Sequence, residues 1–336
     1  QDAAGGHAYV LLCAYHKFGD PRYLKHCKSA VEALLSQKES RFYEALLPLG
    51  AYTAACLNAT EGTNYDVHRL LDWVFDGCQS PTGRTGWGII VGKWGDYDVS
   101  GLQGSITDRG GYAFFMNSIK PAWPFIPMVK YQPQFAKAIG KWMLNNASAC
   151  RLFYPGNIDE KHQWAPELKD ITNNNVSYEG LRKEDDYGKE ELKGVSPVAI
   201  GDGPKWIEGN PTESMFSVYS SSPVGILGAI VNTTNVEGIL QLDCNATDFY
   251  IEKPYPVYLY YNPYGESKSI HYTSSQACDL FDIVAKEYVA KNIKTTGSFD
   301  IPGKEARIIV ELPVGTTLSL TDGKIIANKQ NIISYN

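Results

Sequence analysis

The sequence lacks an uninterrupted apolar run approaching the ~20 residues that a membrane-spanning helix needs, so it predicts no transmembrane segment. Gln1 is followed at once by a stretch of helical character, "DAAGGHAYVLLCAY", and no signal peptide is visible there, as expected of a processed or truncated chain. The sequence has no excess of positive charge, because its 37 acidic side chains outnumber its 31 basic ones and give a net charge of −6. Phosphate binding needs clustered cations, so this balance argues against a nucleic-acid partner.

Metal and redox motifs are absent as well. The seven cysteines form no C-x-x-C pair and no zinc pattern, and no histidine begins an H-E-x-x-H motif. The sequence contains neither a G-x-S-x-G nucleophile motif nor a phosphate-binding loop. We therefore expect no metal and no cofactor. The cysteines on predicted helices are expected to be small buried hydrophobic residues: Cys13, Cys27, Cys56 and Cys150.

Apolar positions recur at helical spacing through the first 155 residues, and short polar breaks divide them into helix pairs. In the first break, "FGDPRY", Asp20 can cap the following helix and Pro21 suits its first turn. The breaks "TEGTNYD" and "YQPQ" divide the second and third pairs, and a further pair is expected at "SPVGILGAIV" and "VEGILQLDCNATDF". Repeated antiparallel pairs favour a helical array or toroid, in which each pair buries one face against its neighbours.

The composition then changes twice. Residues 155–221 are rich in Pro, Gly, Asn and charge and show little periodicity, which predicts a long loop region. After about residue 248, short β-branched or aromatic runs alternate with turn signals. They predict a small antiparallel β-sandwich over 248–336, with Asp322-Gly323 in a tight hairpin. The expected fold is therefore mainly α over 1–247, with a β domain after it.

The helix pairs resemble the helical-toroid enzymes of carbohydrate metabolism, namely the six-hairpin glycosidase superfamily and the toroid-type polysaccharide lyases. Three segments carry the resemblance, together with the β tail from Tyr255: "AYHKFGDPRYLKHCKSAVEALL", "LNATEGTNYDVHRLLDWVFDG" and "VKYQPQFAKAIGKWMLNN". The resemblance implies an α/α toroid followed by a β-sandwich, a polysaccharide substrate, and a secreted or periplasmic location. The chain shows about four hairpins where the complete toroid has six, and it matches no catalytic signature of these families.

One stretch interrupts the helical pattern: "WGIIVGKWGDYDVSGLQGSITDRGGYAFFMN", from Trp87 to Asn117. Its glycines let the backbone turn sharply and approach a ligand, while its aromatic rings and polar groups suit the faces and hydroxyls of a sugar. The alternative interpretation is a glycine-rich connection whose tryptophans cover the edge of the core. The candidate substrate-binding residues in this stretch are Trp87, Trp94, Tyr97, Gln103, Arg109 and Asn117.

Two chemistries are compatible with this stretch. Glycoside hydrolysis needs two carboxyl groups, one acting as an acid and one as a base or nucleophile, and the nearest candidates are Asp96, Asp98 and Asp108. A lyase instead needs a Tyr or His that removes a proton beside a uronate carboxylate, which Asn, Gln or Arg neutralises. Tyr112 and His162 are the candidate bases for that reaction.

The loop region adds further candidates. Trp164 lies beside His162 in "DEKHQWAP", and "SYEGLRKE" brings together Tyr178, Glu179 and Arg182. On a helix Glu179 and Arg182 would be an ordinary i,i+3 pair, whereas on a loop they could reach over a cleft. The run "RKEDDYGKEELK" mixes both charges and is expected to be a solvated surface.

These patterns predict a carbohydrate-active enzyme that cleaves glycosidic bonds of a polysaccharide, with hydrolysis ahead of lyase chemistry. Two alternatives remain open: a non-catalytic glycan-binding module that uses the same aromatic residues, and a helical scaffold whose loops bind another protein. The expected partner is a polysaccharide or oligosaccharide, and the sequence does not indicate an oligomeric state.

Overall fold

The computed structural model describes residues 2–76, 86–168, 176, 178–186, 188–200 and 222–335. The chain begins with four helices: α1 (Ala3–Phe18), α2 (Pro21–Leu35), α3 (Leu46–Glu61) and α4 (Val67–Phe75). As predicted, the Asp20 carboxylate accepts a hydrogen bond from the backbone N–H of Arg22 at the start of α2, and Pro21 occupies its first turn. Asp66 caps α4 in the same way through the Arg69 N–H.

The later helices are α5 (Phe115–Ile119), α6 (Ala122–Tyr131), α7 (Ala136–Ala149) and α9 (Ser222–Ile230). α5 ends before Pro121, and α6 continues through Pro124 and Pro127. Pro124 lies in the first turn of α6, where no helical hydrogen bond is lost, and Pro127 is buried between Ile126 and Met128, so tertiary packing holds the helix together there. Among the described residues, no helix combines the length and apolar character needed to cross a membrane.

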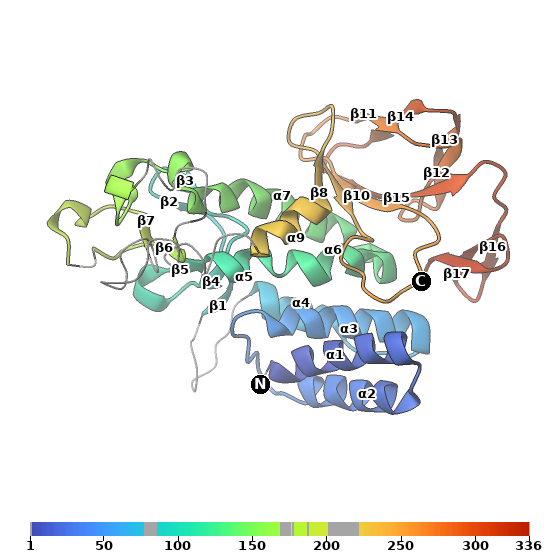
Figure 1. The fold of residues 1–336 in the computed structure, drawn as a ribbon, viewed down its shortest axis with the longest axis horizontal. Coiled ribbons are helices and arrows are strands. Elements are labelled where there is room, and N and C mark those ends of the chain that lie inside the picture. The colour runs from blue at the N-terminus through green and yellow to red at the C-terminus, as the bar shows by residue number, and fades with distance from the viewer. Residues whose placement is uncertain are drawn as a thin grey trace.

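The predicted α/α toroid is wrong. The described helices stack in successive layers: α1 packs against α2 and α3, α3 against α6, and α6 against α7 (Figure 1). The chain leaves the helical pattern after α4 and forms strands, so the next helix pair returns as another layer instead of continuing around a ring. The top of the stack is closed by strands β10 and β15, which contact α7. Because several antiparallel sheets accompany the helices, the expected mainly-α class is also wrong.

The stretch after α4 forms a five-stranded antiparallel sheet with the order β1-β4-β5-β6-β7. Its strands are β1 (Trp87–Ile89), β4 (Gln103–Ser105), β5 (Tyr112–Phe114), β6 (Gly180–Arg182) and β7 (Val198–Ile200). A small hairpin, β2 (Lys93–Trp94) and β3 (Tyr97–Asp98), projects from it. The part predicted as a long loop therefore supplies two strands of this sheet, which joins residues about 70 positions apart.

Short 3-10 helices connect these elements. They are η1 (Asp108–Gly110), η2 (Pro133–Phe135), η3 (Cys150–Phe153), η4 (Pro155–Asn157), η5 (Glu160–His162), η6 (Pro166–Leu168) and η7 (Glu190–Leu192).

The C-terminal part is rich in strands, as predicted, but it begins at Val231. A six-stranded antiparallel sheet has the order β13-β12-β15-β10-β9-β8, and one of the smaller sheets beside it shares a buried core with it. Its strands are β8 (Val231–Thr233), β9 (Leu240–Asp243), β10 (Val257–Tyr261), β12 (Cys278–Asp282), β13 (Glu287–Ile293) and β15 (Ala306–Pro313). Because β9 lies within "VEGILQLDCNATDF", the helix expected there is wrong.

The smaller sheets are a pair and a triplet. The pair consists of β11 (Lys268–Thr273) and β14 (Thr296–Ile301), and the triplet of β16 (Leu318–Thr321), β17 (Lys324–Ala327) and β18 (Asn331–Ser334). The tight hairpin predicted at Asp322-Gly323 is confirmed: Thr321 pairs with Lys324, and both turn residues have positive φ.

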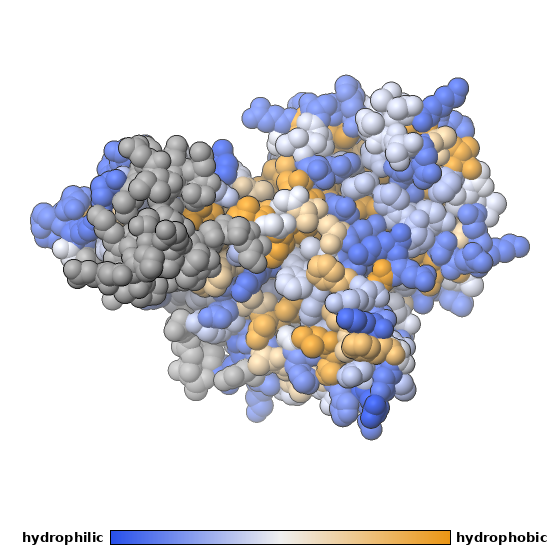
Figure 2. Space-filling view, viewed as in Figure 1, coloured by the Kyte–Doolittle hydropathy of each residue, from blue (hydrophilic) through white to orange (hydrophobic). Residues whose placement is uncertain are grey.

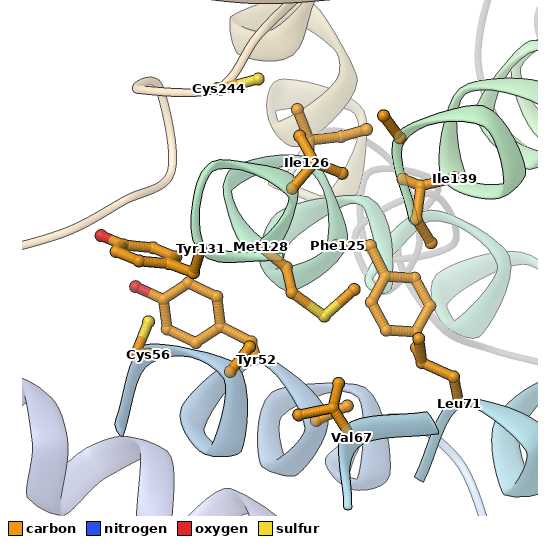
Figure 3. Packing of buried hydrophobic residues seen from close by; sticks show 14 of the residues in the cluster. Tyr52, Cys56, Val67, Leu71, Phe125, Ile126, Met128, Tyr131, Ile139 and Cys244 are labelled. Atoms are coloured by element: carbon orange, nitrogen blue, oxygen red, sulfur yellow. The ribbon is translucent and has the colours of Figure 1, made fainter. Parts of the chain in front are cut away.

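The main core lies between the helix layers and the six-stranded sheet. Figure 3 shows Tyr52 and Cys56 of α3 facing Tyr131 and Met128 of α6. The predicted burial of Cys27, Cys56 and Cys150 is confirmed, whereas Cys13 is half-buried. Figure 2 shows a largely hydrophilic face, with hydrophobic side chains gathered over α9 and α1.

A buried carboxylate joins the layers. Asp248, from the segment between β9 and β10, is fully buried and accepts hydrogen bonds from the Tyr52 hydroxyl, from the Tyr131 hydroxyl at 2.8 Å and from the Lys130 ammonium at 2.5 Å. We refer to these four residues as the Asp248 junction. It ties α3 and α6 to the strand-rich part of the chain.

Candidate functional site

The five-stranded sheet places two of the predicted site residues on one face. Tyr112 of β5 and Arg182 of β6 are directly opposite each other in the antiparallel register, so their side chains point to the same side. The Arg182 guanidinium lies over the Tyr112 ring, 3.8 Å from its centroid. This is a close cation–π contact, in which the negative face of the ring attracts the cation.

A glycine lets Tyr112 reach a third residue. A Cβ added to Gly180 would lie 2.4 Å from Cε2 of the Tyr112 ring, so the ring crosses β6 where a side chain is absent. The Tyr112 hydroxyl thereby donates a hydrogen bond to the Glu179 carboxylate. The backbone carbonyl of Glu179 accepts a hydrogen bond of 2.8 Å from the Phe115 N–H, which fixes the start of β6.

Asp108 is the fourth residue of the group. It lies in η1, between β4 and β5, and its backbone N–H donates to the Ser105 hydroxyl at 3.0 Å. The Asp108 carboxylate accepts a hydrogen bond of 2.6 Å from Nη1 of Arg182. Asp108, Tyr112, Glu179 and Arg182 therefore form one continuous set of contacts, which we call the Asp108–Glu179 cluster.

The cluster has a buried base and an open edge. Tyr112 is 8% exposed and the Arg182 side chain 16%, whereas the Asp108 side chain is 52% exposed. Glu179 is half-buried. Carboxylate oxygens therefore reach solvent at the edge of the sheet, while the cation and the ring between them are held by packing.

A cavity adjoins this edge. It has a volume of about 340 Å³ and is lined by Glu184, Asp185, Asp186 and the segment 192–196. The Glu184 carboxyl group lies 3.2–3.3 Å from the position that a Cβ on Gly110 would take, so the cavity borders η1, which carries Asp108. Sequence reasoning missed these lining residues because it assigned the mixed-charge run to a solvated surface, and charge pattern alone carries no signal of a cavity.

The predicted aromatic platforms lie elsewhere. Trp87 and Trp94 are 3% and 6% exposed, so their faces are enclosed by the protein and offer no surface on which a sugar could stack. Trp87 packs on Tyr43, with ring centroids 4.9 Å apart. The Trp94 ring lies directly beneath Gly111, where an added Cβ would be 2.6 Å from it. Trp94 therefore supports the loop that carries the cluster.

Three of the predicted polar and aromatic contacts are also core residues. Gln103 and Asn117 are 0% and 1% exposed, and Tyr178 is 1% exposed. The Gln103 amide donates to the backbone carbonyl of Glu44, and the Tyr178 hydroxyl donates to Gln163 at 3.2 Å. Burial raises the pKa of Tyr178 to about 12. Within the described residues, Oε1 of Gln103 and Nδ2 of Asn117 have no hydrogen-bond partner.

The β2–β3 hairpin carries the other two aspartates. Asp96 and Asp98 are exposed, and Asp98 accepts a hydrogen bond from the Ser100 N–H at 2.9 Å. The structure shows no contact between either aspartate and the cluster. Tyr97 is half-buried, and its ring lies 5.0 Å from that of His162.

His162 and Trp164 are held by the loop region. His162 is 7% exposed, and its Nδ1 lies 2.7 Å from the carbonyl oxygen of Pro197, which requires the proton on that nitrogen. Trp164 is half-buried, and the Lys189 ammonium lies 4.8 Å from the centroid of its ring. The side chain of Arg109 lies outside the described part of the chain. Of the predicted site residues, the structure thus brings together Asp108, Tyr112, Glu179 and Arg182.

Comparison with known proteins adds no further assignment. No family model matches the sequence, and no curated protein matches it significantly. The resemblance to glycosidases and lyases therefore stays a prediction. In the part of the chain that the structure describes, no group of three or more His, Cys, Asp or Glu side chains could hold a metal ion.

Proposed function

We propose that the protein cleaves glycosidic bonds of a polysaccharide by hydrolysis, with the Asp108–Glu179 cluster as its reaction site. The observation that carries the proposal is a pair of carboxylates, Asp108 held by the Arg182 guanidinium and Glu179 by the Tyr112 hydroxyl. A cavity borders η1, the turn that carries Asp108. Glycoside hydrolysis uses two carboxyl groups on either side of the bond that breaks. Asp108 and Glu179 would share the acid and base roles, and Arg182 and Tyr112 would position them.

The charge of the cluster supports hydrolysis over elimination. Asp108 and Glu179 bring two carboxylates to the Tyr112–Arg182 pair. Such a site stabilises the positive charge that develops on the sugar ring in an oxocarbenium-like transition state. It would repel the carboxylate of a uronate substrate, which a lyase must bind.

Lyase chemistry is the second candidate, and one contact favours it. The Tyr112 hydroxyl donates a hydrogen bond to the Glu179 carboxylate while Arg182 lies over its ring, so the phenol has both a hydrogen-bond acceptor and a cation beside it. A tyrosine in this setting can serve as a general base. Arg182 would then have to leave Asp108 to neutralise a uronate.

A polysaccharide panel, assayed together for new reducing ends and for ultraviolet absorbance, tests the proposal. Hydrolysis gives reducing ends alone, whereas elimination also gives an unsaturated product that absorbs. We expect Asp108→Asn and Glu179→Gln each to lower the rate by a factor of about 10²–10⁴. Asp96→Asn is the matched control, because Asp96 is an exposed carboxylate on the β2–β3 hairpin, and it should leave the rate unchanged. Equal losses for all three variants would contradict the assignment.

Location follows from the substrate. Polysaccharides do not cross membranes, so we propose that the chain acts in secreted or periplasmic form. Cell fractionation with an antibody against the chain tests this, and recovery in the cytoplasmic fraction alone would contradict it.

A further inference from the structure

A second cavity lies where two breaks between helices meet. An open groove of about 680 Å³ is lined by residues 63–66 of the break between α3 and α4 and by Gln132, Gln134 and Phe135 of the break between α6 and α7. This volume is within the range of about 300–1,000 Å³ that is typical of ligand sites. The ends of α3 and α6 that border it point away from the five-stranded sheet, so the groove lies at the opposite end of the helix layers from the Asp108–Glu179 cluster (Figure 1).

One wall of the groove is held rigidly by a single side chain. The Asn58 amide accepts hydrogen bonds from the Tyr65 N–H at 2.7 Å and from the Thr63 hydroxyl at 2.8 Å, and it donates to the Tyr65 carbonyl at 2.8 Å. All three partners belong to the break itself. The conformation that presents Tyr65 to the groove is therefore fixed before any ligand binds, which lowers the entropic cost of binding.

The lining combines aromatic rings with amides. Tyr65, His68 and Phe135 contribute rings, and the His68 and Phe135 centroids are 6.0 Å apart with their planes inclined by 52°. Gln134 donates an amide hydrogen bond to Gln132, which leaves the Gln134 carbonyl and the Gln132 amino group available. None of the described lining residues is lysine or arginine.

We propose that this groove binds a neutral saccharide chain. The rings match the C–H faces of pyranose units, and each free amide can donate to one hydroxyl and accept from another. Without lysine or arginine, the lining offers no fixed cation to hold a uronate, a sulfate or a phosphate group. The inference does not rest on cleavage at the Asp108–Glu179 cluster, since a polysaccharide could be held here whether or not the chain also breaks it.

Calorimetric titration tests the groove in a background that cannot turn over substrate. The full chain with Asp108→Asn and Glu179→Gln would be titrated with cellohexaose, maltohexaose, xylohexaose and mannohexaose, and with hexagalacturonate as the charged comparison. We expect at least one neutral hexasaccharide to bind and hexagalacturonate not to bind. Adding Gln134→Ala or Phe135→Ala should weaken that binding tenfold or more.

The matched control is Gln276→Ala, an exposed glutamine on the loop between β11 and β12, and it should leave the affinity unchanged. Circular dichroism would verify that Phe135→Ala folds, and Gln134→Ala tests the groove at an exposed position. Binding that survives both substitutions would overturn the proposal, as would a lack of binding to every neutral hexasaccharide. Binding in the groove without turnover by the unmodified chain would instead overturn the hydrolase and leave this proposal standing.

Discussion

Two groups of side chains in this molecule have nearly the same composition and opposite surroundings. The Asp248 junction and the Asp108–Glu179 cluster each combine carboxylate, cation and tyrosine. Asp248 is fully buried, whereas the Asp108 side chain is 52% exposed. The composition of a group therefore does not determine its role.

The difference lies in where the hydrogen bonds of each carboxylate go. The carboxylate oxygens of Asp248 accept hydrogen bonds from side chains of α3 and α6, and these bonds join parts of the fold. A buried ion pair of this kind is tolerated because its charges are paired and hydrogen-bonded. The Asp108 side chain pairs with its cation and is still 52% exposed, and a cavity borders the turn that carries it. The first arrangement fits a structural connection, and the second leaves room for a ligand.

Removing each aspartate is the strongest way to break this comparison. We expect Asp248→Ala to lower the free energy of unfolding by about 3–5 kcal/mol, because it leaves the Lys130 ammonium buried without its counter-charge. Asp108→Ala should cost no more than about 1 kcal/mol, since its ion pair is exposed to solvent on one side. Urea unfolding monitored by tryptophan fluorescence measures both. Similar losses would show that the cluster is as structural as the junction.

A third carboxylate separates burial from ion pairing. Asp2 is 7% exposed and accepts a hydrogen bond from the Tyr43 N–H at 3.2 Å. Burial raises its pKa from 3.8 to about 6, with the Tyr43 hydrogen bond acting in the opposite direction. Between these two pH values the folded chain binds more protons than the unfolded chain, so stability falls as the pH rises.

Asp2→Asn should remove the loss of stability that the ionisation of Asp2 causes as the pH rises. The variant is expected to gain stability over the parent chain between pH 4 and pH 7, by up to about 3 kcal/mol, since one pKa unit corresponds to about 1.4 kcal/mol. Unfolding curves of both proteins at several pH values give the difference. Asp20→Asn is the control of opposite sign, because hydrogen bonds from Arg22 lower the pKa of Asp20. A difference for Asp2→Asn that does not change with pH would show that burial does not perturb this carboxyl group.

Local chemistry predicted the helix starts and the hairpin well. Asp20 with Pro21, and Asp322 with Gly323, each act through neighbours in the sequence, and both behave as expected. The arrangement of the helix pairs could not be obtained in this way. It depends on β1–β7, whose strands pair residues such as Tyr112 and Arg182 that are far apart in the chain. Short strands of three residues carry too little periodicity to be recognised.

The candidate site shows the same division. Residue type and local spacing suggested Asp108 with Tyr112 and Glu179 with Arg182, but no local pattern joins the first pair to the second. Their contacts depend on strand register and on the missing side chain at Gly180. Trp87 and Trp94 were plausible sugar platforms by type, and only the packing places them in the core. Whether a tryptophan is buried depends on residues that pack against it from elsewhere in the chain, and a local sequence pattern does not predict them.

The finest test of the comparison removes one hydroxyl from each group. Tyr131→Phe should cost about 1–2 kcal/mol, because Asp248 is fully buried and loses a donor that water cannot replace. Tyr112→Phe should change stability by less than about 0.5 kcal/mol, since half-buried Glu179 can take a water molecule instead. Parallel urea titrations resolve the two values. If Tyr112→Phe lowered the free energy of unfolding as much as Tyr131→Phe, the Tyr112–Glu179 hydrogen bond would be a structural part of the sheet. The assignment of the cluster as a reaction site would then be contradicted.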